Sequence, residues 1–248
     1  MKKALLFVGA LLFCMSSMAQ TAEEVSAMSA DQLPAVLAKA KTEAVYTAVA
    51  RRYSSLGDAT KAAEVQESLL KKFPNGITAR NQTVSELYQL KTGAEAEKFY
   101  KTWIKRFDPA KMTWNIVYDY AAYSVAYVYA EEANAPKAVE YINKTTDPVW
   151  SCSSKITVAQ MLAKKGCKKE ADDLVLATVA QAEKVYAEPT TNANAKAELG
   201  IVFRSYAHQL YAEGKTKEAL AQYDKVVPSL RDATYARLLA ENGKLMQA

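Results

Sequence analysis

Histidine, cysteine and clustered tyrosine side chains are the groups of this sequence that could do chemistry. Its 248 residues include one histidine, His208, and three cysteines, none of them in a C-x-x-C pair. They contain no G-x-S-x-G, H-E-x-x-H, G-x-G-x-x-G or Gly-rich phosphate-loop motif. Carboxylates are spread along helical patterns, as on solvated faces. We therefore expect no enzyme activity, no cofactor and no metal site in this chain, and binding is the better-supported role.

Tyrosine is frequent, with 15 residues, and three of the tyrosines share a helical face. Tyr120, Tyr123 and Tyr127 are spaced by three and four residues, which places them on one side of a helix. Tyrosine combines apolar area with a hydroxyl group, as binding surfaces favour. Two readings stay open: a platform for a ligand, or packing between neighbouring helices. His208 is likewise either part of a binding groove or an incidental surface residue.

Composition predicts helices. Hydrophobic residues make up 50% of the chain and charged residues 24%, as is ordinary for a folded protein. Only 8 glycines and 7 prolines argue against a loop-rich β fold. The net charge of +5 includes Lys2 and Lys3, and it is too weak and too dispersed to favour nucleic-acid binding. We therefore expect an all-α protein.

Residues 1–19 have the layout of a secretory signal peptide. Lys2-Lys3 is the charged start, the apolar run 4–13 is too short to span a bilayer, and Ser17-Met18-Ala19 is a small-x-small cleavage site. No later segment reaches about 18 apolar residues. We expect the mature chain to start at Gln20, to be exported to the periplasm, and to lack stable membrane insertion. The alternative is a buried N-terminal helix.

The cysteines are expected to be free thiols. Cys14 belongs to the leader, and Phe13 before it is too large for a lipoprotein signal. Between Cys152 and Cys167, residues 153–165 form one helical pattern, which holds its ends roughly 20 Å apart at about 1.5 Å per residue. A disulfide needs Cα atoms within about 7 Å. The spacing therefore argues against a disulfide between these two residues.

One stretch shows how the helices are expected to be arranged. In residues 44–74 two helical patterns meet at Gly57, with small residues at Ala50 and Ala62, an aromatic at Tyr53 and a closing proline. This layout resembles a tetratricopeptide (TPR) repeat, a pair of antiparallel helices in about 34 residues. In such a pair, small residues let the helices approach, glycine allows the turn, and proline ends the second helix.

The pattern recurs along the chain, and the insertion loop 188–192 interrupts it. We expect a lead-in helix at 20–42, with start signals at Asp31 and Pro34, and then a TPR-like α-solenoid at 43–248. The solenoid would hold about five repeats and an unfinished sixth. Further small positions are Ala96, Ala126, Ala138, Ala159, Ala171, Ala207, Ala219 and Ala236, and further turns are expected at Gly93, 132–136, Gly166, Gly214 and Gly243.

The TPR resemblance also implies a binding surface, because the first helix of each repeat lines the inner face in that family. A protein or an extended peptide would bind there. Trp103, Trp114 and Trp150 are expected to pack between repeats. The implied partner-binding residues are Arg51, Tyr88, Tyr120, Tyr123, Tyr127, Arg204, His208, Tyr211 and Arg237.

The chain also resembles the N-terminal helical region of exported bacterial thiol–disulfide oxidoreductases of the TlpA/ResA type. The residues that carry this resemblance are Met18-Ala19-Gln20, Lys71-Lys72-Phe73-Pro74, Val117-Tyr118-Asp119, Tyr235-Ala236 and Asn242-Gly243-Lys244. The thioredoxin-like C-x-x-C is absent, so redox chemistry cannot be assigned to any residue here.

Three functions follow as expectations. The first is an exported scaffold that binds protein or peptide through its concave face. The second is a docking or regulatory region of such an oxidoreductase. The third, which no residue selects, is an accessory in outer-membrane assembly or polysaccharide uptake. Ala248 falls inside an unfinished repeat, which favours a longer protein, unless residues 232–242 form a capping helix.

Overall fold

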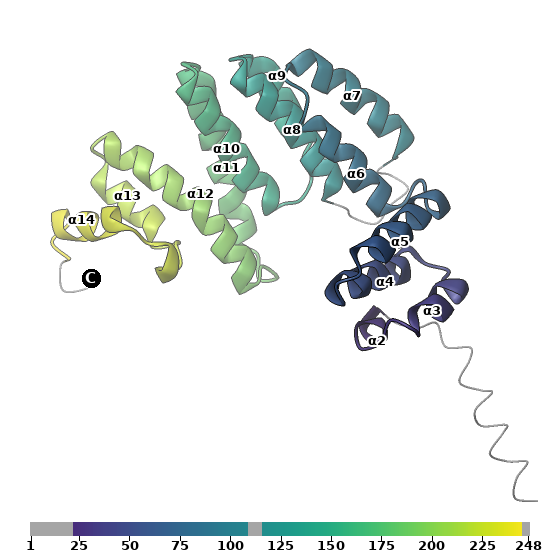
Figure 1. Cartoon of the computed structure of the whole chain (residues 1–248). Coiled ribbons are helices and arrows are strands. Elements are labelled where there is room, and N and C mark those ends of the chain that lie inside the picture. Colours follow the sequence, from purple (N-terminus) through teal and green to yellow (C-terminus); the bar gives the residue numbers. More distant parts are fainter. Residues whose placement is uncertain (1–21, 109–115, 245–248) are drawn as a thin grey trace, which may run out of the picture. The chain divides into compact units, whose positions relative to one another are not determined.

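The computed structural model describes residues 22–108 and 116–244, and every regular element in these ranges is a helix. The predicted all-α class is therefore confirmed. The chain divides into two compact units, Met1–Gln82 and Thr83–Ala248, with the boundary inside one helix (Figure 1). The predicted signal peptide and mature start, together with Cys14, Trp114 and Ala248, lie outside the described residues.

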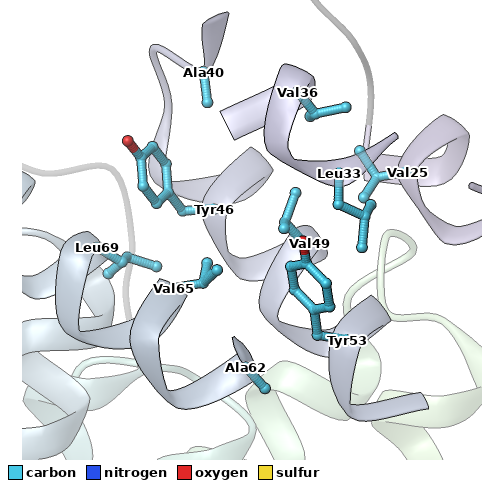
Figure 2. Packing of buried hydrophobic residues seen from close by; sticks show 10 residues of the cluster. All are labelled: Val25, Leu33, Val36, Ala40, Tyr46, Val49, Tyr53, Ala62, Val65 and Leu69. Carbon is cyan, nitrogen blue, oxygen red and sulfur yellow. The ribbon is translucent and has the colours of Figure 1, made fainter. Parts of the chain in front are cut away.

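The first unit is built around a helix pair and two shorter helices that precede it. Aliphatic and tyrosine side chains from all four helices meet in one core, in which Leu33 and Val49 are fully buried (Figure 2). Lys72 Nζ closes its edge by donating to Ala40 O at 2.8 Å. The four helices are α2 (Ala22–Ser26), α3 (Leu33–Lys39), α4 (Glu43–Ser55) and α5 (Ala59–Lys72). The unit ends within the next helix, α6 (Ile77–Leu87).

The segment 20–42 differs from the single lead-in helix that the sequence predicts. Its described part holds two short helices, α2 and α3, and both pack against α4. Asp31 does not cap α3, because its carboxylate accepts from Ser29 Oγ at 2.5 Å and the N-cap residue is Gln32. Pro34 lies in the first turn of α3, where its missing N–H group costs nothing.

The second unit consists of helix pairs in which each helix contacts its neighbour in sequence. The pairs α8–α9, α10–α11 and α12–α13 pack internally, and α10 also contacts α8 and α12 (Figure 1). Helix α7 packs on α8, and α14 packs on α13. The bounds are α7 (Gly93–Arg106), α8 (Val117–Glu131), α9 (Ala135–Ile142), α10 (Trp150–Lys164), α11 (Lys168–Ala187), α12 (Ala193–Ala212), α13 (Thr216–Tyr223), the 3-10 helix η3 (Pro228–Leu230) and α14 (Ala233–Glu241).

Small residues occupy the helix contacts of this unit, as the sequence predicts. Ala126 and Ala138 are fully buried where α8 meets α9, and Ala207 and Ala219 are fully buried where α12 meets α13. A side chain larger than methyl at these points would force the helices apart. Ala236 is the exception: it is exposed on α14, so its predicted role in packing is wrong within the described part of the chain.

Four of the predicted glycine turns have the left-handed backbone that favours glycine. Their φ angles are 84° at Gly57, 91° at Gly166, 77° at Gly214 and 70° at Gly243. The turn between α8 and α9 lacks glycine, and Ala133 takes the same conformation there with φ 59°. The pairing of the two helices thus imposes the left-handed backbone conformation at this position, even on an alanine, for which it is less favourable.

Exchanging the residue types of two of these turns is expected to change stability in opposite directions. Ala133→Gly should raise the free energy of unfolding by about 1 kcal/mol, because it removes left-handed strain from an L-residue. Gly166→Ala should lower it by about 1 kcal/mol, and the cost is conformational because an added Cβ meets nothing within 4 Å. Urea unfolding of both variants measures the two changes. A loss of stability in Ala133→Gly would contradict the assigned backbone conformation.

A buried carboxylate joins α7 to α8 and α9. Glu97 accepts from Tyr129 Oη and pairs with Lys101 Nζ at 2.5 Å and Lys137 Nζ at 3.3 Å. The hydrogen bonds from Lys101 and then Tyr129 lower the pKa of Glu97 to about 2, against the opposing effect of burial. Burial and the bond to Glu97 raise the pKa of Tyr129 to about 12.

This network predicts an acid-sensitive contribution to stability. Because the pKa of Glu97 is lower in the folded chain than its ordinary 4.5, its contribution is present above pH 4.5 and is lost as pH falls toward 2. Glu97→Gln should cost about 2 kcal/mol at pH 6 and almost nothing at pH 2, as followed by urea unfolding across this range. Glu140→Gln, on the solvated side of Lys137, is the control with a flatter profile. Equal losses for Glu97→Gln at both pH values would refute the linkage.

Candidate binding face on α8, α10 and α12

Three neighbouring helices present aligned stripes of side chains. Successive members of each stripe are three, four or seven residues apart, so each stripe lies on one helical face. Two contacts join the stripes of α10 and α12: Ser153 Oγ lies 3.3 Å from Glu198 Oε1, and Gln160 Nε2 donates to Ser205 Oγ at 3.1 Å. We call this surface the polar-aromatic face; it comprises Tyr120, Tyr123 and Tyr127 on α8, Trp150, Ser153 and Gln160 on α10, and Glu198, Ile201, Ser205 and His208 on α12.

Aromatic rings gather at the α8 side of this face. The ring centroid of Trp150 lies 4.7 Å from that of Tyr120 and 5.7 Å from that of Tyr123, and the tilted ring of Tyr127 lies 5.9 Å from that of Tyr123. Tyr120 keeps 38% of its surface exposed, and Tyr88 keeps 56%. Burial raises the pKa of Tyr123 to about 12, with further contributions from Tyr127, Tyr88 and Tyr120. We call Tyr88, Tyr120, Tyr123, Tyr127 and Trp150 the aromatic cluster.

The tyrosine stripe packs against the next helix pair and also keeps exposed surface, so the ligand-platform reading stays a prediction. Tyr120 and Tyr123 pack against Trp150 of the next helix pair, as the packing alternative requires. They nevertheless keep solvent-accessible surface, because Tyr120 is exposed and Tyr123 is only half-buried. Trp103 is buried, as expected for a residue that packs between helices. It is 3% exposed, and its Nε1 donates to Thr83 Oγ1 at 2.9 Å.

An open pocket lies at the α12 side of the face. Its volume is about 420 Å³, within the range of ligand pockets. The guanidinium of Arg204 donates from Nη1 to Leu230 O at 3.0 Å, and Ile201 supplies exposed aliphatic surface. Arg204 forms no ion pair among the residues that the structure describes. The lining residues are Gln160, Ile201, Arg204, Ser205, His208 and Asp232.

His208 is held in place by two partners from other elements. Its Nε2 lies 2.8 Å from Asp232 Oδ2 and 2.8 Å from Tyr223 Oη, and Tyr223 Oη donates to Asp232 Oδ1 at 2.7 Å. Burial is the largest effect on the pKa of Asp232 and opposes ionisation, but the hydrogen bonds from Tyr223, His208 and Thr234 outweigh it and lower this pKa to about 2. The carboxylate therefore stays ionised and fixes the imidazole at the edge of the pocket.

The geometry predicts which imidazole nitrogen carries the hydrogen. Because Asp232 is an acceptor and the Tyr223 hydroxyl is already donated to it, the neutral ring of His208 should be the Nε2–H tautomer. As the chain has one histidine, a ¹⁵N spectrum reports on it without ambiguity. Asp232→Ala should leave a mixture of tautomers. A dominant Nδ1–H form in the unsubstituted protein would contradict the arrangement.

The structure brings together two groups of the residues that the sequence predicts. Tyr88, Tyr120, Tyr123 and Tyr127 belong to the aromatic cluster, and Arg204 and His208 line the pocket. The hydroxyl of Tyr211 donates to Glu241 Oε1 of α14 at 2.9 Å, on the same helix as the exposed Arg237. Arg51 is exposed on α4 in the other unit, so the structure does not join it to this face.

Sequence reasoning did not assign several residues of this region to a binding site. Trp150 was expected to pack between repeats, and the spacing of Trp150, Ser153 and Gln160 would have revealed their common face. Asp232 precedes a helix as an N-cap residue, which is a sequence signal for position but not for contact with His208. The packing of Trp150 was predicted, and the residues that were missed are Ser153, Gln160, Glu198, Ile201, Ser205, Tyr223 and Asp232.

The two remaining cysteines lie at opposite ends of α10 and form no disulfide with each other. Cys152 is fully buried and donates to Pro148 O at 3.3 Å, and burial raises the pKa of its thiol to about 11. Cys167 Sγ lies 3.5 Å from Ala133 O, in the turn between α8 and α9. Both positions fit structural thiols.

Within residues 22–108 and 116–244, no group of histidine, cysteine and carboxylate side chains is arranged to hold a metal ion. None of the described helices combines the length and apolar character needed to cross a bilayer. Comparison with models of known protein families gives no match, and comparison with curated proteins finds no similar sequence. The resemblances to TPR proteins and to TlpA/ResA-type oxidoreductases therefore stay predictions.

Proposed function

We propose that this chain binds an extended polypeptide segment along the polar-aromatic face. The observation that carries the proposal is that α10 contributes Trp150 to the aromatic cluster and Gln160 to the open pocket, and packs on both α8 and α12. An extended segment crossing from α8 to α12 would meet aromatic surface first and the pocket second. Spaced anchor points of this kind suit alternate side chains of an extended chain.

The chemistry of the face matches a polypeptide backbone with side chains. Gln160 and Ser205 offer hydrogen-bonding groups in the pocket wall, and among the described residues Arg204 is bonded through Nη1 alone, which leaves its other donors to a ligand. Ile201 and the half-exposed rings supply apolar area. A small number of placed polar groups on an otherwise apolar surface is typical of peptide and ligand sites.

The finer architecture belongs to the same proposal. A TPR-like solenoid would place the first helix of each pair side by side on its concave face, and α8, α10 and α12 are the first helices of three packed pairs. The left-handed glycine turns and buried alanines support this arrangement. Export to the periplasm through residues 1–19 is proposed on the sequence pattern alone.

Selection of a phage-displayed library of random peptides on the immobilised protein tests the proposal. Peptides should be enriched, and Ile201→Asp should weaken the selected peptides at least tenfold by placing a charge in the pocket. Leu176→Asp is the matched control, because Leu176 is also an exposed aliphatic residue but lies on α11. Absence of enriched peptides, or equal loss of binding in both variants, would refute the proposed face.

A docking role within a thiol–disulfide oxidoreductase is the second proposal, and it rests on the sequence resemblance. Reading the DNA beyond the Ala248 codon tests it. An open frame that encodes W-C-x-x-C would support the role, and an immediate stop codon would refute it.

A further inference from the structure

Several groups of rings outside the aromatic cluster have a lysine or arginine of the chain over a ring face. Lys144 Nζ lies 3.6 Å from the ring centroid of Tyr141, and Lys225 Nζ lies 4.9 Å from that of Phe203. These contacts are cation–π interactions, in which a positive charge of the chain lies over the electron-rich face of a ring. Similar pairs are Lys61 with Tyr53, Lys72 with Tyr46, Lys196 with Tyr186 and Arg231 with Tyr235.

No lysine or arginine of the described residues lies over a ring of the aromatic cluster. Lys155 on α10 and Lys196 on α12, the lysines nearest in sequence to Ser153 and Glu198, contact other residues. Lys155 Nζ donates to Gln181 Oε1 at 2.8 Å, and Lys196 Nζ lies over the ring of Tyr186. Among the described residues, no positively charged group of the chain therefore occupies the ring faces of the cluster.

A carboxylate lies beside the cluster. Ser153 Oγ is 2.9 Å from Trp150 O and 3.3 Å from Glu198 Oε1, so one hydroxyl links the backbone of the cluster to this side chain. Glu198 is half-buried on α12 and forms no ion pair among the residues that the structure describes. An unpaired carboxylate next to clustered aromatic rings has the charge that attracts a cation.

We propose that the aromatic cluster, with Glu198 beside it, binds an organic cation, supplied as the lysine or arginine side chain of the bound polypeptide. This inference rests on the proposed function and names the side chain that the aromatic anchor takes. An uncharged apolar side chain fits less well, because it would cover the Glu198 carboxylate and the tyrosine hydroxyls without giving them a partner. A cation gains from the ring faces and from the carboxylate together.

A pair of isosteric probes isolates the charge. Choline and 3,3-dimethylbutan-1-ol have the same shape and differ in one positive charge. Titration of each into the protein is followed through the indole N–H signal of Trp150, which is assigned by its disappearance in Trp150→Phe. Choline should bind with a dissociation constant at least fivefold lower than that of the neutral alcohol.

Two variants locate the preference. Tyr123→Leu should reduce the preference for choline to less than about twofold, and Glu198→Gln should reduce it about twofold to threefold while leaving the rings in place. Tyr186→Leu is the matched control, since Tyr186 already has Lys196 over its ring, and it should keep the full preference. Melting temperatures of the variants verify that they are folded. Equal binding of the two probes, or an unchanged preference in Tyr123→Leu, would overturn the inference.

The selected peptides separate this inference from the proposed function. Basic residues should be enriched in them, and replacing the basic residue by norleucine should weaken binding at least tenfold to the unsubstituted protein but less than twofold to Tyr123→Leu. Peptides that bind without any basic residue would overturn the cation site and leave the polypeptide-binding face standing. Failure to select any peptide would refute the face itself, and the choline titration would still decide whether the cluster prefers a cation.

Discussion

Replacement of Asp119 by alanine is expected to lower the free energy of unfolding by about 3 kcal/mol. Asp119 is 2% exposed in the first turn of α8, and its carboxylate organises the turn that leads into α10. It accepts from Thr146 N at 2.9 Å, from Thr146 Oγ1 at 3.1 Å and from Asp147 N at 2.7 Å. Alanine would leave these donors without their acceptor and a void beside them.

A neighbouring aspartate provides the comparison. Asp147 accepts from Val149 N at 3.0 Å and Trp150 N at 2.6 Å, so it caps α10 from a half-buried position. Asp147→Ala should cost about 1 kcal/mol, the usual effect of losing a helix cap. Urea unfolding of both variants gives the two values. If Asp119→Ala costs no more than Asp147→Ala, the buried carboxylate does not hold this turn as the structure indicates.

Gly93→Ala is expected to destabilise the second unit by about 3 kcal/mol through overpacking. Gly93 begins α7, and its N–H donates to Glu132 Oε1 at 2.9 Å. A Cβ at this position would overlap the ring carbons Cδ1 and Cε1 of Tyr129. That ring is buried, and its hydroxyl is bonded to Glu97, so it cannot move aside without losing the network that joins α7, α8 and α9.

Gly200→Ala is the matched control, with the opposite expected sign. Gly200 lies in the interior of α12, and the atoms nearest to an added Cβ are Leu230 Cδ1 and Val226 Cα, both at an ordinary 3.7 Å. Alanine should therefore stabilise by up to about 1 kcal/mol, because it favours the helix over glycine. Thermal unfolding of the two variants tests the pair. A Gly93→Ala protein as stable as the parent would show that α7 does not approach Tyr129 this closely.

The sequence by itself determined the local features of this fold. Helix-prone stretches, glycine turns such as Gly166 and small residues such as Ala207 follow from interactions within about four residues and from the backbone freedom of glycine. The spacing of Tyr120, Tyr123 and Tyr127 likewise fixed their common face. These predictions needed only the helical period, which is a local property.

Only the tertiary structure decided which stripes adjoin. The contact of Trp150 with two tyrosines of α8, and the hydrogen bonds of His208 with Tyr223 and Asp232, join residues from different helices and the loops between them. The side-chain conformations and the packing of one helix on the next set these distances, and no single helix carries that information. The sequence therefore determined which residues share a helical face. Tertiary packing decided that an aromatic cluster, the Glu198 carboxylate and an open pocket lie on adjoining helices, because it set which helices touch.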